Sequence, residues 1–304
     1  MNKLTRREFI KNSASYLASL IIGINDDNKK PNVVNYKPVY KHNHKYKRGG
    51  KFSHSKPTWC ELRKGLYFTR LIVYRDNEPV DSMGLVKADP NYNKFRVFHD
   101  RENPKTIEKW QEYTNADVIF NSSYYQDTLD PVGLIITNGK MKGPKVNKAM
   151  KGMFVAEPVD DRKPKATIID FSEELFDYKN PKWMEGVQSF PMLLDKNGNI
   201  GVKNSRWYAN RTVLCTDRDG NIIVLTTEGG YFSLYDMGLF LRESELNIKN
   251  ALNMDGGYEA EMMVKTDKLI YLTYGQWETQ GKIDISIPWI HIRIPAVIGI
   301  FPRK

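Results

Sequence analysis

The segment that runs from Ala251 to Gly257, Ala-Leu-Asn-Met-Asp-Gly-Gly, joins a short apolar run to a carboxylate and two glycines. A strand that ends in this way presents Asp255 beside bare backbone, which another molecule can approach closely. A carboxylate in such a position could act as a nucleophile or as an electrostatic stabiliser. Asp-Gly is also a common two-residue hairpin turn. The septet alone leaves both a catalytic site and a plain hairpin open.

The elements around this septet are predicted to be strands more often than helices. Residues 104–113 have the pattern of a helix, and a second helix should begin at Ser233, where Asp236 gives a variant of the capping box. No regular alternation of strands and helices and no internal repeat is present, which predicts an α+β class with a mixed or antiparallel sheet core and a few packed helices. The expected strands span residues 65–74, 95–98, 117–120, 132–137, 212–216, 222–227 and 251–254.

The positive charge is concentrated at the N-terminus. The 304-residue chain has a formal net charge of +10, of which residues 1–25 carry +3 and residues 26–56 carry +7. Residues 57–304, which should form one folded domain, are therefore close to neutral. A nucleic-acid-binding domain would have a basic face of its own, so nucleic acid is not an expected partner.

Residues 1–25 resemble a twin-arginine export signal. Arg6 and Arg7 are followed by an apolar pair and by Lys11, and a modest apolar stretch spans residues 16–24. That stretch is shorter than the roughly 20 residues of a membrane-spanning helix. The resemblance implies export by the twin-arginine machinery to the periplasm or cell envelope, whereas an amphipathic N-terminal helix is the alternative reading. No alanine-based cleavage site follows residue 24, so the segment could remain as an inner-membrane anchor.

Residues 26–56 are rich in Lys, Asn, His and Tyr and have almost no aliphatic periodicity, which predicts a disordered basic linker. Its three histidines could bind a metal, but their spacing matches no known site, and a solvated spacer is the simpler reading. Only His99 and His291 occur in the following domain. The sequence thus predicts no cofactor, while an oxygen-ligated divalent cation such as Ca²⁺ stays open.

Cys60 and Cys215 are the two cysteines of the chain. They could pair in an oxidising compartment, although two cysteines so far apart in sequence have no spacing signature. Two buried free thiols are the favoured interpretation.

Several stretches, in this order along residues 65–300, resemble the phosphodiester glycosidase family. The first is Asn-Ser-Ser-Tyr-Tyr at 121–125, with serines where the family usually has glycines. A Gln-x-x-Pro segment follows at 188–191, and an Asn-Arg-Thr strand start at 210–212. The strand with Asp-Gly-Gly at 253–257 and a closing strand with Arg293 and Pro295 complete the series. The family includes the uncovering enzyme, which removes N-acetylglucosamine from phosphodiester-linked mannose, and many bacterial envelope proteins.

This resemblance implies a glycoside hydrolase that passes through an oxocarbenium-like transition state. Asp255 would stabilise the positive charge or attack the anomeric carbon, and Glu228, which precedes Gly229-Gly230, is the second candidate carboxylate or else a plain loop residue. Arg211 would neutralise the phosphate with its planar guanidinium, or would form a salt bridge across the sheet. Asn121 and Asn253 could hold sugar hydroxyls or cap local backbone.

The remaining expected substrate contacts are Gly256, Gly257, Glu259 and Arg293. Here the sequence departs from the family pattern, because Tyr-Glu-Ala-Glu follows the glycines in place of glycine and serines. Glu259 and Glu261 lie two apart on an expected strand, so both should face the same side. They could replace the missing hydroxyl contacts, or they could form a solvated face.

Three functions fit these observations. The first is an exported hydrolase that splits a sugar from a phosphodiester-linked glycan, an exopolysaccharide or another envelope component. The second is an ordinary glycosidase on non-phosphorylated glycans. The third is a non-catalytic carbohydrate-binding or envelope-assembly protein on the same fold, which the missing serines keep open.

Overall fold

A computed structural model describes residues 50–144, 147–205, 207–280, 283–286 and 292–304, together with the short strands β1 (Leu20–Ile22) and β2 (Val34–Asn35). Apart from these two strands and residues 50–56, the expected export segment and linker lie outside the described residues, as do His42, His44 and His291. The backbone alone is described for β1, β2 and residues 277–280 and 283–286. No helix among the described residues has the length and apolar character needed to cross a membrane.

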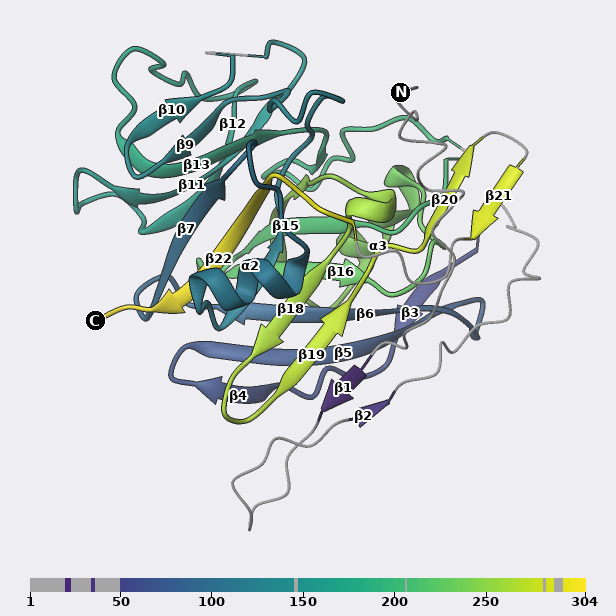
Figure 1. Ribbon diagram of the computed structural model, residues 1–304. Helices are drawn as coiled ribbons and strands as arrows, with labels where there is room; N and C mark the ends of the chain where they lie inside the picture. Colours follow the sequence, from purple (N-terminus) through teal and green to yellow (C-terminus); the bar gives the residue numbers. More distant parts are fainter. Residues whose placement is uncertain are drawn as a thin grey trace, which may run out of the picture.

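Three antiparallel sheets make up most of the fold, and about 45% of the described residues are in strands (Figure 1). The eight-stranded sheet has the order β14–β17–β15–β16–β6–β5–β3, with β4 also paired to β5. Its strands are β3 (Phe52–His54), β4 (Cys60–Arg63), β5 (Leu66–Arg75), β6 (Glu78–Ala88), β14 (Met192–Leu194), β15 (Thr212–Asp217), β16 (Ile222–Thr227) and β17 (Ile248–Asn253).

The seven-stranded sheet has the order β2–β1–β19–β18–β8–β22–β7, and the five-stranded sheet the order β10–β9–β13–β11–β12. The first adds β7 (Asn93–His99), β8 (Val118–Asn121), β18 (Met262–Lys265), β19 (Ile270–Thr273) and β22 (Ala296–Pro302). The second consists of β9 (Ile135–Thr137), β10 (Lys140–Lys142), β11 (Gly152–Pro158), β12 (Ala166–Asp170) and β13 (Trp183–Ser189). A separate hairpin joins β20 (Trp277–Gln280) to β21 (Ile283–Ser286).

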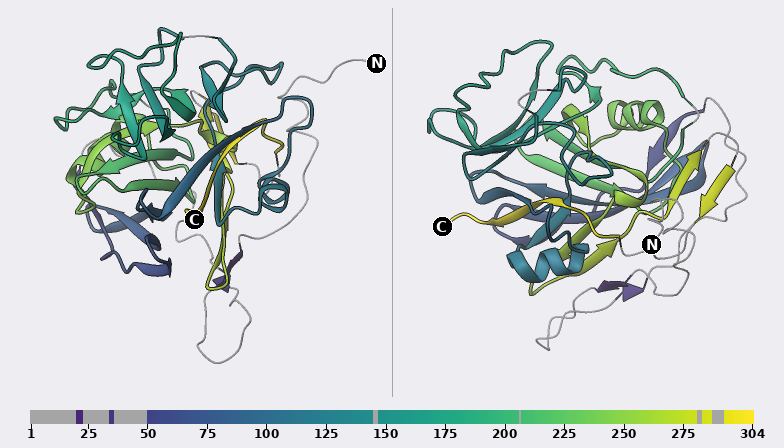
Figure 2. Two further views of the ribbon diagram at one scale, coloured as in Figure 1. Left: turned by 90° about the vertical axis from the view of Figure 1, so that its left-hand side faces the viewer. Right: turned by 45° about the horizontal axis from the view of Figure 1, so that its top comes forward.

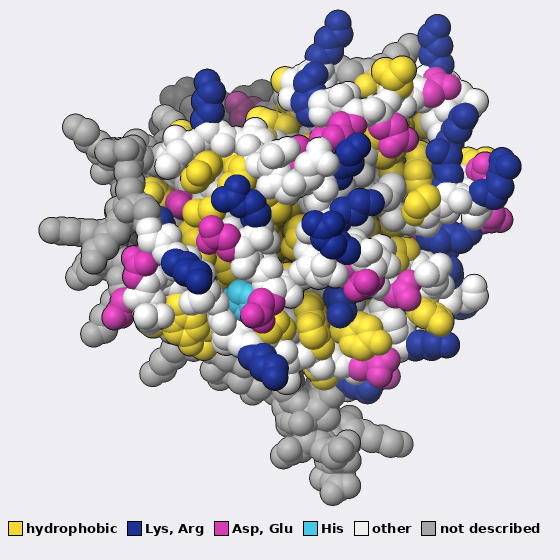
Figure 3. Space-filling model, turned by 180° about the vertical axis from the view of Figure 1, so that it is seen from behind, with side chains coloured by type: hydrophobic (Ala, Val, Ile, Leu, Met, Phe, Trp, Pro, Cys, Tyr) yellow, Lys and Arg dark blue, Asp and Glu magenta, His cyan; other side chains and the backbone are white. Residues whose placement is uncertain are grey.

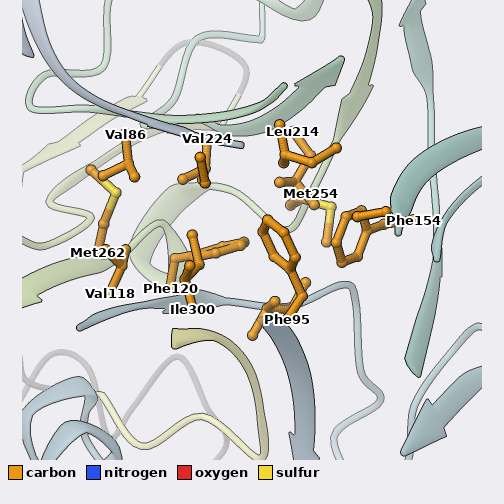
Figure 4. Packing of buried hydrophobic residues seen from close by; sticks show 14 of the residues in the cluster. Val86, Phe95, Val118, Phe120, Phe154, Leu214, Val224, Met254, Met262 and Ile300 are labelled. Carbon is orange, nitrogen blue, oxygen red and sulfur yellow. The ribbon is translucent and has the colours of Figure 1, made fainter. Parts of the chain in front are cut away.

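One hydrophobic core lies where the three sheets face one another (Figure 4). Leu214 and Val224 from the eight-stranded sheet meet Phe120 from the seven-stranded sheet and Phe154 from the five-stranded sheet, all with less than 1% exposure. Met254, the residue immediately before Asp255, is fully buried in the same cluster. Asp255 therefore directly follows a residue of the hydrophobic core.

Each of the two largest sheets has a helix on its outer face (Figures 1 and 2). The helix α3 (Leu234–Glu243) packs Met237 and Phe240 on the eight-stranded sheet. Its N-cap is Ser233, whose hydroxyl accepts from the Asp236 amide, which confirms the expected start. The helix α2 (Ile107–Thr114) packs Trp110 on the seven-stranded sheet and begins after Thr106, three residues later than predicted from Pro104. The α+β class is confirmed.

The folded region begins before the boundary that the sequence suggested at residue 57. Phe52 is 3% exposed and stacks on Phe232, and β3 pairs with β5. His54 packs its ring against Phe240 and accepts from the Glu245 amide at 3.4 Å, so its surroundings are those of a packed side chain. The apolar residues of 50–56 were too few to show as a strand in the sequence.

On the face shown in Figure 3, basic and acidic side chains are interspersed and no single basic patch stands out. This distribution agrees with the near-neutral charge of the domain. Both cysteines are free thiols; Cys215 is buried as expected, whereas Cys60 is exposed, so the expectation of burial was wrong for Cys60. Burial raises the pKa of Cys215, with the neighbouring Asp217 adding to the rise.

Candidate functional site

The Asp-Gly-Gly segment connects two sheets and is not a hairpin turn. It follows β17 of the eight-stranded sheet, enters the 3₁₀ turn η1 (Gly257–Glu259), and leads to β18 of the seven-stranded sheet. Gly257 has φ +69°, a conformation that favours glycine. A Cβ on Gly256 would lie only 2.9 Å from the Asn210 carbonyl oxygen. Both glycines are thus required by the local backbone, and the half-buried Asp255 stands at the crossover.

Asn121 fixes the backbone of Asp255 from the end of β8. Its side-chain Nδ2 donates to the Asp255 carbonyl at 2.8 Å and to the Ser122 carbonyl at 3.2 Å. Its Oδ1 accepts from the Thr212 hydroxyl at 2.7 Å and from the Glu261 amide at 3.1 Å. Asn121 is 1% exposed. These contacts occupy both of its donor hydrogens and its carbonyl oxygen, so Asn121 positions Asp255 and has no donor left for the sugar hydroxyl that the sequence suggested.

Asn253 positions a tyrosine beside the carboxylate. Its Nδ2 donates to the Tyr124 hydroxyl at 2.7 Å, to the Met254 carbonyl at 2.6 Å and, more distantly, to the Phe190 carbonyl at 3.3 Å. The Tyr124 hydroxyl in turn donates to the Phe190 carbonyl at 3.0 Å. Asn253 is fully buried, so its first role is to fix Tyr124.

Arg211 immediately precedes β15, whose first residues pair with the end of β17. Its Nε donates to the Phe232 carbonyl at 3.1 Å and its Nη2 to the Trp207 carbonyl at 2.7 Å. Its Nη1 would be 3.4 Å from a Cβ on Gly256, so the missing side chain there leaves the guanidinium close to the turn. Backbone carbonyls accept hydrogen bonds without cancelling the positive charge, and Arg211 is 5% exposed.

Asp255 and Arg211 both act on Tyr124. Burial raises the pKa of Tyr124 well above its ordinary value, the Asp255 carboxylate raises it further, and the Arg211 guanidinium and the Asn253 hydrogen bond lower it. Tyr124 is therefore a neutral hydroxyl at physiological pH. The charges of Asp255 and Arg211, which the sequence placed in one site, thus both influence the pKa of the same tyrosine.

Buried polar atoms without a hydrogen-bond partner gather in this neighbourhood. They include the hydroxyls of Ser122 and Ser123 and the Oδ1 of Asn253, each in a residue with 6% exposure or less. An unsatisfied buried polar atom is costly, and its persistence in a cluster indicates a place where a bound molecule or water supplies the partner. In the sequence, Ser122 and Ser123 stood out only because the family usually has glycines at these positions.

Glu228 has surroundings that favour a structural role over the expected catalytic one. Its two oxygens accept from Arg70 at 2.7 and 2.5 Å, from the Ser82 hydroxyl at 2.6 Å and from the Tyr271 hydroxyl at 3.2 Å. This bidentate pair is largely buried, with side-chain exposures of 10% and 14%. A carboxylate with four such donors is stabilised in place and is poorly available to attack a substrate.

Glu259 and Glu261 do not share one side of a strand, so that expectation was wrong. Glu259 belongs to the turn η1, where its carboxylate accepts from the Tyr125 hydroxyl at 3.4 Å. Glu261 is fully buried, its oxygens have no hydrogen-bond partner, and burial, followed by the charge of Glu108, raises its pKa well above the usual range. Glu261 therefore forms no solvated face.

Arg293 is exposed and precedes the isolated bridge between Lys105 and Ile294, at the approach to β22. Its contact with substrate stays a prediction. Among the residues that the structure describes, no three His, Cys, Asp or Glu side chains group as a metal site would require.

Tyr124 is the main residue of the site that sequence reasoning left without a role. It lies in the Asn-Ser-Ser-Tyr-Tyr stretch, three residues after Asn121. Its contacts with Asn253 and Phe190 span 129 and 66 residues of sequence, so only the fold reveals them.

Comparison with known proteins identifies the family of the chain. The model of the phosphodiester glycosidase family matches residues 114–300, which is more than half of the chain and includes Asn121, Arg211 and Asp255. The chain belongs to the phosphodiester glycosidase family. The resemblance that the motifs suggested is confirmed. No match is found among the curated proteins.

Solved structures show the same fold at low sequence identity. The catalytic domain of zebrafish N-acetylglucosamine-1-phosphodiester α-N-acetylglucosaminidase, auto-inhibited by its pro-peptide, aligns with a TM-score of 0.58 and 16% identity over 83% of this chain and 88% of its own. A hypothetical protein from Synechocystis aligns at 0.52 and 14% identity, over 82% and 64%. A putative exported protein from Burkholderia pseudomallei aligns at 0.50 and 8% identity, over 84% and 97%.

Proposed function

We propose that this member of the family is a hydrolase that cleaves a sugar from a phosphodiester-linked glycan of the cell envelope or an exopolysaccharide. The observation that carries the proposal is the closeness of Arg211 to the Asp255-Gly256-Gly257 turn, within the region that the family model matches: Arg211 Nη1 would be 3.4 Å from a Cβ on Gly256, and the Gly257 amide donates to the Asn210 carbonyl at 2.9 Å. A carboxylate and a guanidinium side by side suit a reaction in which positive charge grows on carbon and negative charge on a departing phosphate.

Asp255 serves the sugar side of the reaction. Its backbone is held by the Asn121 amide and by its own amide, which donates to the Ser122 carbonyl at 3.2 Å. Its carboxylate Oδ1 accepts from the Gly256 amide at 2.9 Å, which fixes one oxygen of the carboxylate. A carboxylate fixed in this way can stabilise an oxocarbenium-like transition state or form a covalent bond to the anomeric carbon.

Arg211 serves the phosphate side mainly through its charge. Two of its nitrogens donate to backbone carbonyls, so the guanidinium is committed to a fixed place and does not present a free two-pronged edge. A phosphate monoester is a weak base as a leaving group, so neutralising its charge matters more than giving it a proton. Tyr124 is a neutral hydroxyl in the same place and can donate a hydrogen bond to an oxygen of the substrate.

The proposed location is the periplasm or the cell envelope, after export through the twin-arginine machinery. The support is the sequence of residues 5–11 and the apolar stretch that follows. The double substitution Arg6→Lys and Arg7→Lys should leave the protein in the cytoplasm. Fractionation of cells that make this variant measures its location. A doubly substituted protein that still reaches the periplasm would remove this part of the proposal.

The activity is tested with three probes: methyl esters of sugar 1-phosphates, nitrophenyl glycosides without phosphate, and an array of immobilised glycans. We expect release of sugar from the phosphodiesters, and a fall in kcat/KM of about 10³-fold or more for Asp255→Asn. The matched control is Asp219→Asn, which changes an exposed carboxylate in the turn between β15 and β16 and should leave kcat/KM unchanged.

Each other outcome selects a different function. Hydrolysis of nitrophenyl glycosides alone would indicate an ordinary glycosidase and refute the phosphodiester proposal. Glycan binding without turnover, unchanged in Asp255→Asn, would indicate a non-catalytic carbohydrate-binding or envelope-assembly protein.

A further inference from the structure

Two exposed aromatic side chains border the site in addition to its charged groups. Phe190 is 39% exposed and Trp207 is 48% exposed, whereas most large apolar side chains that the structure describes are buried. Large aromatic rings cost free energy when they face water. Exposed rings beside a charged site therefore indicate a surface for a ligand with an apolar face.

The backbone around Phe190 is held firmly to the site. The Ser189 hydroxyl donates to the Asn253 carbonyl at 2.7 Å, and the Asn253 amide donates to the Pro191 carbonyl at 3.0 Å. The Phe190 carbonyl accepts from the Tyr124 hydroxyl, and the two rings are 4.8 Å apart between centroids. The Phe190 ring is thus fixed against Tyr124, with an angle of 40° between the two ring planes.

The backbone of Trp207 is held to the site by Arg211. Its carbonyl accepts from Arg211 Nη2 at 2.7 Å, and the carbonyl of Asn210, three residues on, accepts from the Gly257 amide at 2.9 Å. The stretch 207–210 therefore runs alongside the Asp-Gly-Gly turn. Phe190 is therefore joined to the site through Asn253, and the backbone of Trp207 is joined to it through Arg211.

From these contacts we propose that Phe190 and Trp207 form an aromatic platform that binds the apolar face of a pyranose ring next to Asp255. One face of many pyranoses carries mainly C–H groups, and a flat aromatic ring buries that face without competing for its hydroxyls. The unsatisfied Ser122 and Ser123 hydroxyls and Asn253 Oδ1 supply polar partners in the same neighbourhood. This inference rests on the proposed function for its location and assigns the sugar, and not the phosphate, to the aromatic residues.

Binding is measured on the wild-type protein, the parent of the variants below, because free sugars and methyl phosphate contain no sugar–phosphate diester bond to cleave. Saturation-transfer NMR with glucose, galactose, mannose, N-acetylglucosamine and methyl phosphate gives a Kd for each. We expect at least one of the sugars to bind, and Phe190→Ala and Trp207→Ala each to weaken that binding about tenfold. Methyl phosphate binding should not change. Tyr113→Ala is the matched control, because Tyr113 is an exposed aromatic residue (68%) on α2.

Two further variants test whether sugar binding needs an aromatic ring at position 190 or only an apolar side chain. Phe190→Leu keeps an apolar side chain and should lose the sugar affinity, whereas Phe190→Tyr keeps the ring and should retain it. Thermal unfolding of each variant shows whether it folds. Equal sugar affinity in Phe190→Ala, Trp207→Ala and the parent, or no binding of any of the four sugars to the parent, overturns the platform.

The inference and the proposed function fail in distinguishable ways. If the protein binds a sugar through Phe190 but hydrolyses none of the phosphodiesters, the aromatic platform is supported and the proposed hydrolase activity is refuted. Turnover of a phosphodiester with an unchanged KM in Phe190→Ala would leave the enzyme standing and remove the platform.

Discussion

Replacing Asn121 by aspartate tests the claim that its amide holds the Asp255 backbone. The substitution Asn121→Asp preserves the shape and the Oδ1 acceptor but removes both N–H donors. The carbonyls of Asp255 and Ser122, at 2.8 and 3.2 Å from Nδ2, would then face an oxygen. Since the site is 1% exposed, water cannot replace the lost donors.

The structure sets the size of the effect and its dependence on pH. A protonated carboxyl could restore one of the two donors, which leaves about one orphaned carbonyl at a cost of ~1–3 kcal/mol. Keeping that carboxyl neutral at pH 7, against an unfolded pKa of about 3.9, costs a further ~4 kcal/mol at most. The folded-state pKa of the new group is raised, so its penalty is small below about pH 4 and grows as the pH rises. We expect a loss of free energy of unfolding of ~1–3 kcal/mol at pH 4 and up to ~5–7 kcal/mol at pH 7.

Urea unfolding followed by tryptophan fluorescence at the two pH values measures both losses, each relative to the wild-type protein at the same pH. Asn180→Asp, at an exposed loop position, is the matched control and should change stability by less than about 0.5 kcal/mol at either pH. A loss for Asn121→Asp below about 1 kcal/mol at pH 7, or the same at both pH values, would refute the claim that the amide donates to two buried carbonyls.

Three further results should follow from the structure. Glu228→Gln should destabilise the fold by ~3–5 kcal/mol in urea unfolding, because it breaks the largely buried pair with Arg70, while kcat of the folded variant stays within about tenfold; a loss of kcat as large as that of Asp255→Asn would make Glu228 catalytic. Burial raises the pKa of Asp81 to about 7, above its unfolded value, so the stability of the wild type relative to Asp81→Asn should be greatest near pH 4 and fall by up to ~4 kcal/mol by pH 8; a constant difference would contradict this. Ellman's reagent should titrate one thiol in the native protein, Cys60, and the buried Cys215 only after unfolding; rapid reaction of two thiols in the native state would disagree with the structure.

Local signals in the sequence were sufficient for the elements that carry the site. The turn between β15 and β16 contains Asp-Gly-Asn, and the two strands pair from Thr212 with Thr226 to Thr216 with Ile222, as the pattern predicted. Ser233 caps α3 as predicted, because a hydroxyl and an amide three residues apart are enough to determine that contact. These features depend on residues that are close in sequence.

Features that depend on distant partners could not be predicted. Whether Asp-Gly-Gly turns back as a hairpin or crosses to another sheet depends on where β18 pairs, and its partner β8 lies more than 130 residues earlier. Glu228 is paired with Arg70 across 158 residues, so its loop-like sequence context gave no sign of the ion pair. Glu261 is fully buried although acidic residues are mostly exposed, so composition favoured the wrong surroundings for it.

The difference between satisfied and unsatisfied polar groups separates the parts of the site that hold it together from those that can meet a substrate. Asn121 uses both donor hydrogens and its carbonyl oxygen within the protein. Its side chain connects the Asp255 carbonyl to the Thr212 hydroxyl and to the Glu261 amide. A substitution there changes the position of the carboxylate without touching a ligand. The Ser122 hydroxyl, on the next residue, has no partner. A ligand that donates to or accepts from this hydroxyl would remove a cost already present in the free protein, so Ser122→Ala should reduce ligand affinity and leave the free energy of unfolding equal or higher. The opposite pair of results, unchanged affinity and lower stability, would place the Ser122 hydroxyl with the groups that hold the fold.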